Sequence, residues 1–271
     1  MSGTDNLIIE RKGHTLVVTM NRPEAKNALS PSMLVGMADA WVEADSDDEI
    51  RSIVLTGAGG DFCTGMDLKA FAGGSDVAGG GRSAQIEARM KADPDLHWKA
   101  LLRHYQPTKP LIAAVEGYAV AGGTEILQGT DIRVAGEGAK FGVFEARRGL
   151  FPLGGSTVRL RRQIPFTQAM DLLLTAREVS AAEALQIGLI VRVVPDGQAL
   201  ASALEIAEMI NANGPLAVEA IKRSVRATEG LSEVEGLAKE LEIGWPIFAT
   251  DDAKEGARAF AEKRPAEFKR R

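Results

Sequence analysis

The chain has 271 residues, 45% of them hydrophobic and 25% charged, which suits one substantial globular core. A formal net charge of −5 gives no electrostatic reason to expect nucleic acid or an anionic membrane as a partner. A single cysteine cannot form an internal disulfide and fits a reducing compartment. The N-terminal residues show no signal pattern and no run approaches about eighteen apolar residues, so we expect a cytoplasmic protein without a membrane span.

The first two thirds of the chain repeat a unit of short apolar strand, glycine-containing loop and helix. Such a repeat predicts an α/β coil of units rather than a β-sandwich. Ser30-Pro31 is expected to open a helix, and Pro94 to interrupt a helical stretch at 85–103. The glycine-rich segment 71–82 is expected to be mobile. The expected strands are 7–10, 15–20, 53–55, 111–115, 132–135 and 140–141.

Helical patterns dominate the last third of the chain. Ser180 and Glu183 have the spacing of a capping box, and so do Ser232 and Glu235. A last strand is expected at 190–194, ended by a proline. The helices that follow are expected at 199–211, 215–228, 232–243 and 251–263.

The end of the last strand predicts a division of the chain into two regions. We expect an α/β catalytic core at 1–195 and an all-helical region at 196–271. Helices with exposed apolar stripes often pack on a neighbouring subunit, so the second region is interpreted as an oligomerisation region.

Several common catalytic motifs are absent from the sequence. The GAGG run at 57–60 follows a strand, but Phe62 occupies the sixth position, where a dinucleotide-binding loop needs glycine. His14, His97 and His104 lack the spacing of a metal site or a catalytic triad. Cys63 lies among small apolar residues, so packing is a better interpretation than nucleophilic chemistry. We therefore expect no bound metal.

Two other stretches, FCTGMDL at 62–68 and AVAGGTE at 119–125, are turns that each lead into a helix. A helix start leaves backbone N–H groups unpaired and carries partial positive charge, and glycine allows close approach to the backbone. If the two turns meet, two N–H donors can point at one oxygen, as in an oxyanion hole for a thioester that becomes an enolate. Two tight turns without a ligand would fit the spacing equally well.

Glu125 and Glu145 are acids with apolar neighbours, twenty residues apart. The helix dipole favours the charged form of Glu125 while burial opposes it, and a carboxyl group under both influences can act as acid or base. Two acids beside one oxyanion hole could hold a water molecule between them and pass protons in both directions. The alternative for Glu145 is a salt bridge to Arg147 or Arg148.

The chain resembles the crotonase superfamily, most closely its enoyl-CoA hydratases. The resemblance covers nearly the whole length and combines five motifs in order, which makes it specific. These motifs are NRPEAKNALS, FCTGMDLKAF, AVEGYAVAGGTEILQGTD, KFGVFEARRGLFPLGGS and AFAEKRPAEF.

The resemblance implies a spiral of β-β-α turns with a helical trimerisation region, assembled as a homotrimer or a dimer of trimers. It also implies a metal-free enzyme that adds water, with syn geometry, across the C2=C3 bond of a trans-2-enoyl-CoA thioester. Its oxyanion donors would be the backbone N–H groups of Met66 and Gly122. Glu125 would activate the water for attack at C3, and Glu145 would deliver a proton to C2. Coenzyme A is part of the substrate, so no separate cofactor is implied.

The same resemblance places the CoA moiety. Its pantetheine would run past the Met66–Leu68 turn, which is called the oxyanion turn below. Its phosphates would meet a lysine of the same chain and one of a neighbouring subunit. The residues implied are Lys26, Cys63, Gly65, Asp67 and Leu68, with Lys263 and Phe260 from the neighbouring subunit.

Four departures from the family pattern stand out. Glu116 replaces a usual asparagine, Ala121 replaces a usual glycine, and the loop after Pro152 is one residue shorter than usual. The glycine-rich segment 71–82 replaces a shorter helical piece. The shorter loop affects the expected shape of the acyl pocket and the aim of Glu145, and the glycine-rich segment implies a substrate lid that differs from the family's usual one.

Two alternatives remain open from the sequence. One is a Δ3-Δ2-enoyl-CoA isomerase or another acyl-CoA enzyme on the same scaffold, although isomerases typically need one acid rather than two. The other is a protein that binds CoA esters or RNA without catalysis, although the acidic balance disfavours RNA.

Overall fold

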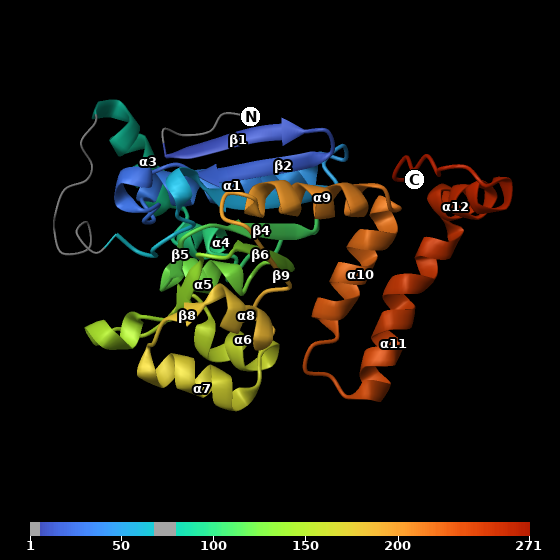
Figure 1. Ribbon diagram of the computed structural model, residues 1–271. Helices are drawn as coiled ribbons and strands as arrows, with labels where there is room; N and C mark the ends of the chain where they lie inside the picture. The colour runs from blue at the N-terminus through green and yellow to red at the C-terminus, as the bar shows by residue number, and fades with distance from the viewer. Residues whose placement is uncertain (1–5, 68–79) are drawn as a thin grey trace.

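A computed structural model describes residues 6–67 and 80–271 (Figure 1). Nine strands lie in the described part of the chain: β1 (Leu7–Lys12), β2 (Thr15–Met20), β3 (Ser52–Gly57), β4 (Leu111–Val115), β5 (Tyr118–Val120), β6 (Ile132–Gly136), β7 (Lys140–Gly142), β8 (Val179–Ser180) and β9 (Arg192–Val194). The helices there are α1 (Pro31–Ser46), α3 (Gly80–Ala92), α4 (Leu96–Ala100), α5 (Gly122–Leu127), α6 (Ser156–Gln163), α7 (Phe166–Thr175), α8 (Ala181–Gln186), α9 (Ala199–Asn211), α10 (Pro215–Ala227), α11 (Glu233–Gly244) and α12 (Asp251–Glu262). Short 3-10 turns are η1 (Pro23–Ala25), η2 (Ala58–Gly60), η3 (Glu145–Arg148) and η4 (Trp245–Ala249).

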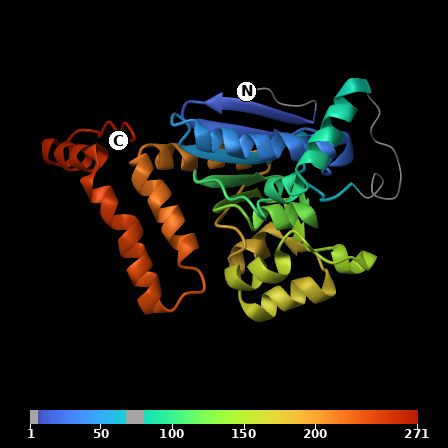
Figure 2. The same cartoon turned by 180° about the vertical axis from the view of Figure 1, so that it is seen from behind.

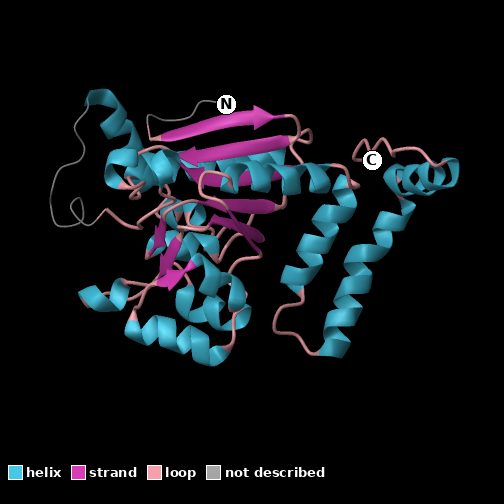
Figure 3. Ribbon diagram, in the orientation of Figure 1, coloured by secondary structure: helices cyan, strands magenta, loops and turns pink. Residues whose placement is uncertain are grey.

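The larger sheet has the order β1-β2-β3-β4-β6-β9, and all its neighbours run parallel except β1 and β2 (Figure 3). Both of its faces are buried, as is usual for parallel strands. On β2, Leu16 and Val18 face the core that holds α1, whereas Val17 faces α9. This alternation explains why the strands are continuous apolar runs rather than half-polar ones.

The smaller sheet has the order β5-β7-β8, and the chain supplies the two sheets in turn. After β4 it makes β5 and α5, and after β6 it makes β7 and η3. The strand-strand-helix spiral is thus present. Because β5 and β7 pair in parallel, the residues that follow them, the start of α5 and η3, lie at the same end of the small sheet.

Beyond the last strand the helices divide into two groups. α9 covers the sheet through Ala199, Ala203 and Ala207, so it belongs to the core although it lies beyond residue 195. α10, α11 and α12 extend away from the sheets in both views (Figures 1 and 2). The inner end of α10 is tied to the core by ion pairs between Lys222 and Asp131, at 2.6 Å, and between Lys109 and Glu219, at 3.1 Å.

Most of the local sequence signals act as expected. The hydroxyl of Ser30 accepts a hydrogen bond from the Met33 amide at the start of α1, and Pro94 separates α3 from α4. Ser232 and Glu235 form the reciprocal capping box. At Ser180 only half of the predicted box forms, because the Glu183 carboxylate pairs with Arg177 instead.

The remaining expectations concern the start of α3, the glycine-rich segment, the CoA contact Leu68 and membrane spans. α3 begins at Gly80, earlier than the expected residue 85. Most of the glycine-rich segment 71–82 and the predicted CoA contact Leu68 lie outside the described residues. Within the described chain, no helix combines the length and apolar character needed to cross a bilayer.

Candidate active site

The two glycine-containing turns meet. A methyl group added at Gly65 would lie 2.6 Å from the amide nitrogen of Gly122, and one added at Gly122 would lie 3.6 Å from the amide nitrogen of Met66. Neither of these two amides has a protein acceptor within residues 6–67 and 80–271. The turns therefore place two free N–H donors side by side, as an oxyanion hole requires.

Short backbone pairings fix the relative position of the turns. Cys63 pairs with Ala119, and Met66 pairs with Leu29, each through an isolated parallel bridge. Ala121, at the entry to α5, has φ 51° and ψ −127°, a conformation that L-residues rarely adopt. The Thr124 hydroxyl supports it by bonding to the carbonyl oxygens of Ala119 and Gly142.

The Asp67 carboxylate is held in place by an ion pair. Its Oδ2 lies 3.1 Å from the guanidinium of Arg22, which also donates to the Ala28 carbonyl at 2.8 Å. Both charged side chains are 11% exposed, so the pair is sheltered from water. It ties the NRP loop to the oxyanion turn, and this is the structural use of the arginine in the NRPEAKNALS stretch.

Glu125 lies in the first turn of α5 and is only 4% exposed. Its Oε2 accepts the Gly154 amide at 2.9 Å, and its Oε1 accepts the Ser156 amide at 3.2 Å. Burial raises the pKa of Glu125, while these amide hydrogen bonds oppose the rise because they stabilise the charged form. The carboxylate is therefore held in one orientation.

Glu145 begins η3 and meets a different environment. Its Oε2 is buried and has no hydrogen-bond partner among the described residues. Burial, and then the negative charge of Glu125, raise the pKa of Glu145 to about 7. The predicted alternative of a salt bridge is wrong for Arg147, whose guanidinium lies over the Phe144 ring at 4.4 Å, and no ion pair joins Glu145 to Arg148 in the described chain.

The two acids thus form an electrostatically coupled pair with different surroundings. Glu125 has two N–H donors that favour its charged form, whereas Glu145 has none of comparable strength. Coupled carboxyl groups whose environments differ tend to separate into one base and one acid. Glu125, in α5, therefore suits the base, and Glu145, in η3, suits the proton donor.

Only some of the predicted CoA-contacting residues lie near the oxyanion turn of the same chain. Lys26 lies next to the oxyanion turn, where its ammonium is 3.5 Å from Asp61 and 4.1 Å from the centre of the Tyr118 ring. Cys63 is fully buried, and burial raises the pKa of its thiol to about 12, which supports the packing interpretation. Phe260 and Lys263 lie at the end of α12, far from α5 in the same chain (Figure 1), so only a second subunit could bring such residues to the site.

Sequence reasoning missed the group that orients Glu125. The amides of Gly154 and Ser156 belong to the LGGS loop, which was noted only as a departure in length. A methyl group added at Gly154 would lie 2.5 Å from Oε2 of Glu125, so glycine is needed there for the close approach. Repeated glycine just before a helix start was the available signal.

No cluster of three or more potential metal ligands occurs in the described ranges. The chemistry that the site can perform rests instead on two N–H donors and two carboxyl groups. α5 links these parts, because it carries the Gly122 amide at its first residue and Glu125 in its first turn. Such an arrangement can stabilise an enolate and move protons beside it.

Comparison with known proteins gives the same class. The family model described as enoyl-CoA hydratase/isomerase matches residues 10–271. Enoyl-CoA hydratase EchA19 of Mycobacterium tuberculosis is 58% identical over 274 residues, covering 100% of this chain and 98% of its own. A short-chain-enoyl-CoA hydratase of Clostridium acetobutylicum is 38% identical, covering 98% and 99% of the two chains. The structure of a putative enoyl-CoA hydratase/isomerase from Mycobacterium abscessus superposes with a TM-score of 0.87 at 44% identity, covering 98% and 100%.

The fold and the site define an acyl-CoA enzyme of the crotonase type, and the predicted superfamily is confirmed. More narrowly, the chain belongs to the enoyl-CoA hydratase/isomerase family. Its relatives support an enzyme with enoyl-CoA hydratase activity.

Proposed function

We propose that the protein adds water across the C2=C3 bond of a trans-2-enoyl-CoA thioester by a metal-free, enolate-type mechanism. The proposal rests mainly on the position of α5. This helix carries both the Gly122 amide, a free donor for the oxyanion, and the buried carboxyl group of Glu125. Glu145, the second acid of the coupled pair, has a raised pKa. No separate cofactor is needed, because CoA is part of the substrate.

The proton transfers balance with these groups alone. Glu125 takes a proton from water as the water oxygen bonds to C3, and the C2=C3 π electrons shift toward the thioester. The thioester oxygen gains negative charge, which the N–H groups of Met66 and Gly122 stabilise. Glu145 then gives its proton to C2, the carbonyl reforms, and the pair returns to its starting state through exchange of one proton with solvent. Delivery of both parts from one side of the alkene gives syn addition.

The test is direct. Incubation with 2-enoyl-CoA esters of increasing chain length should remove the absorbance of the conjugated thioester and yield 3-hydroxyacyl-CoA with one oxygen from ¹⁸O-labelled water. A shift of the double bond in a 3-enoyl-CoA without water uptake would support the isomerase instead. Binding of CoA esters with no turnover of any of them would contradict an enzyme.

We also propose a cytoplasmic homotrimer, or a dimer of trimers, in which α10–α12 contact neighbouring subunits. Support comes from large apolar side chains that are exposed on these helices and on η4: Ile221, Val225, Val234, Leu237, Leu241, Trp245, Phe248 and Phe260. A monomer rarely exposes so large a continuous apolar set. The same assembly would bring the partner end of α12, with Phe260 and Lys263, toward a CoA site.

Substitution of the exposed surface tests this assembly. Leu241→Asp combined with Phe248→Asp should shift the protein to a monomer in sedimentation or light scattering, because two charges would be buried unpaired at the contact. Exposed Leu174→Asp on α7, outside α10–α12, is the matched control and should leave the mass unchanged. A wild-type protein that runs as a monomer at micromolar concentration would argue against the trimer.

A further inference from the structure

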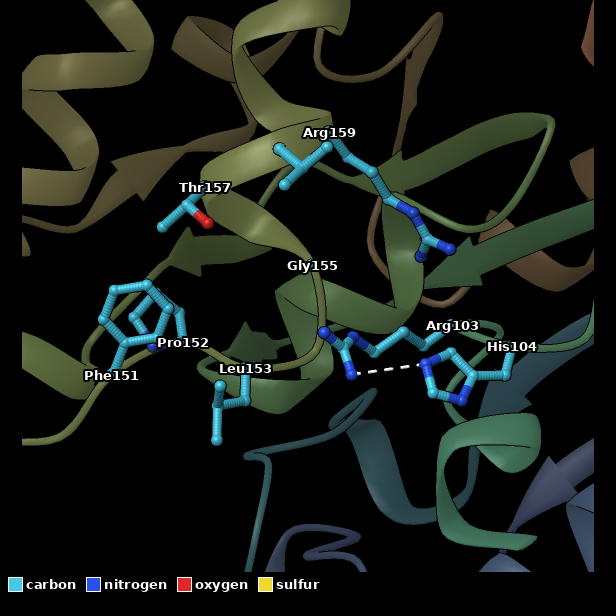
Figure 4. Close-up of a pocket in the computed structure, with 9 residues that line it drawn as sticks. Arg103, His104, Phe151, Pro152, Leu153, Gly155, Thr157 and Arg159 are labelled. Carbon is cyan, nitrogen blue, oxygen red and sulfur yellow. Dashed lines mark hydrogen bonds between the residues drawn. The ribbon is translucent and has the colours of Figure 1, made fainter. Parts of the chain in front are cut away.

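A cavity of about 310 Å³ lies beside the loop at 151–155 and the start of α6 (Figure 4). One part of its wall is apolar and includes Phe151, Leu153 and Val158, all exposed in this chain. The other part carries Arg103, His104 and Arg159. Figure 4 shows Phe151, Pro152 and Leu153 on one side, and His104 and the arginine head groups on the other. The cavity therefore has an apolar flank and a cationic corner.

The cavity lies beside the loop that holds Glu125. Gly155 lines it, and the neighbouring residues Gly154 and Ser156 donate the amides that hold Glu125. Arg159 is close enough to Glu125 for their charges to interact. The cavity is thus next to the carboxyl group that the proposed function places at C3, and its volume is at the lower end of the range for small-molecule pockets.

Arg103 and Arg159 are close enough for their like charges to repel each other. The Arg103 guanidinium stacks on Trp98 at 4.7 Å and lies 3.3 Å from Nε2 of His104. Arg159 donates through Nη2 to the Leu102 carbonyl, but its Nη1 is buried and has no acceptor among the described residues. Burial, and then the charges of Arg226 and Arg103, lower the pKa of Arg159. Arg103, which is exposed at this corner, is open to an acceptor that enters from the cavity.

The acidic groups nearby already have partners. Asp95 is paired with His104, Asp131 with Arg226 and Lys222, and Glu229 with Arg162. Glu125 lies at the catalytic end of the cavity and is held by backbone amides. No carboxylate therefore neutralises Arg103 or fills the free Nη1 of Arg159 in the described part of the chain.

We propose that this cavity binds the far end of the acyl group and selects acyl chains that carry an oxygen acceptor there, with an apolar portion between that acceptor and the thioester. This deepens the proposed function, because it names the substrate class for the same site. Guanidinium groups suit both a carboxylate and a ketone oxygen, and a carboxylate gains most because it accepts two hydrogen bonds and carries charge.

The test uses binding rather than turnover. Calorimetry would compare saturated acyl-CoA esters of equal chain length that end in a methyl group, a methyl ketone or a carboxylate, with free CoA as reference. Wild-type protein should bind an acceptor-ended ester about tenfold more tightly than the methyl-ended one. Arg103→Gln should reduce that ratio to about threefold or less. Exposed Arg162→Gln, one turn along α6 and outside the cavity lining, should leave the ratio unchanged.

Three outcomes overturn the proposal: equal or tighter binding of the methyl-ended ester by wild-type protein, an unchanged ratio in Arg103→Gln, or equal weakening of free CoA by that substitution. A comparison of the ketone ester with the carboxylate ester shows which of the two acceptors the cavity binds more tightly. Failure of the proposed function is seen separately, because it appears as absence of hydration whatever the binding ratio.

Discussion

Replacement of Glu145 by glutamine should lower kcat for hydration by about 10²–10⁴-fold, the usual effect of losing a proton-transfer group. The amide keeps the size of the side chain but cannot give a proton to C2. It also carries no charge, which suits a site where Oε2 is buried without a partner, so the variant should remain folded. Initial rates on a short 2-enoyl-CoA, with circular dichroism and thermal unfolding of the same sample, measure both effects.

The pH dependence of the wild-type enzyme identifies the role of Glu145. In the proposed mechanism hydration requires its protonated form, and burial, followed by the charge of Glu125, raises its pKa to about 7. Below that pH the proton donor is in place, and as pH rises through about 7 the donor is lost, so kcat/KM should decline on the alkaline side. Exposed Glu137→Gln is the matched control and should change neither rate nor profile. A Glu145→Gln enzyme that keeps full activity would remove the proposed acid from the mechanism.

Sequence reasoning placed the elements that follow from short-range patterns. Apolar runs such as Leu111–Val115 predicted the strands because a parallel strand is buried on both faces. The sequence allowed two interpretations of the turns at 62–68 and 119–125, an oxyanion hole or two separate tight turns. The structure shows the turns in close contact at Gly65 and Gly122. Ser30 and Pro94 acted locally and were interpreted correctly.

Features that depend on distant backbone were not predictable in the same way. The glycines at 154 and 155 signal a close approach to the backbone, but a backbone amide does not identify its acceptor, so the sequence could not pair Gly154 and Ser156 with Glu125. Arg103 and Arg159 come from segments that the fold alone brings to one cavity. At Glu183 the local pattern predicted a capping box, but the carboxylate forms a tertiary ion pair with Arg177 instead.

The Gly65→Ala substitution should lower kcat by about 10²–10³-fold, as expected when an oxyanion donor is displaced. The added methyl group would lie 2.6 Å from the Gly122 amide nitrogen and 3.0 Å from the Ala121 side chain, so the two turns must separate. Separation moves the Gly122 amide away from the Met66 amide, and the thioester oxygen then loses one of its two donors. Neither acid is replaced, so the expected loss comes from displacement of an oxyanion donor and not from removal of a proton-transfer group.

Backbone strain alone does not account for that expected loss, and Gly60→Ala separates the two effects. Gly65 and Gly60 have φ of 84° and 87°, so alanine strains both turns by about the same amount, roughly 1–2 kcal/mol. A methyl group at Gly60, however, meets nothing within 4 Å. Gly65→Ala should therefore lose at least as much thermal stability as Gly60→Ala, and only Gly65→Ala should show a large loss of kcat. Comparable kcat in both would mean that the contact between Gly65 and Gly122 does not position an oxyanion donor.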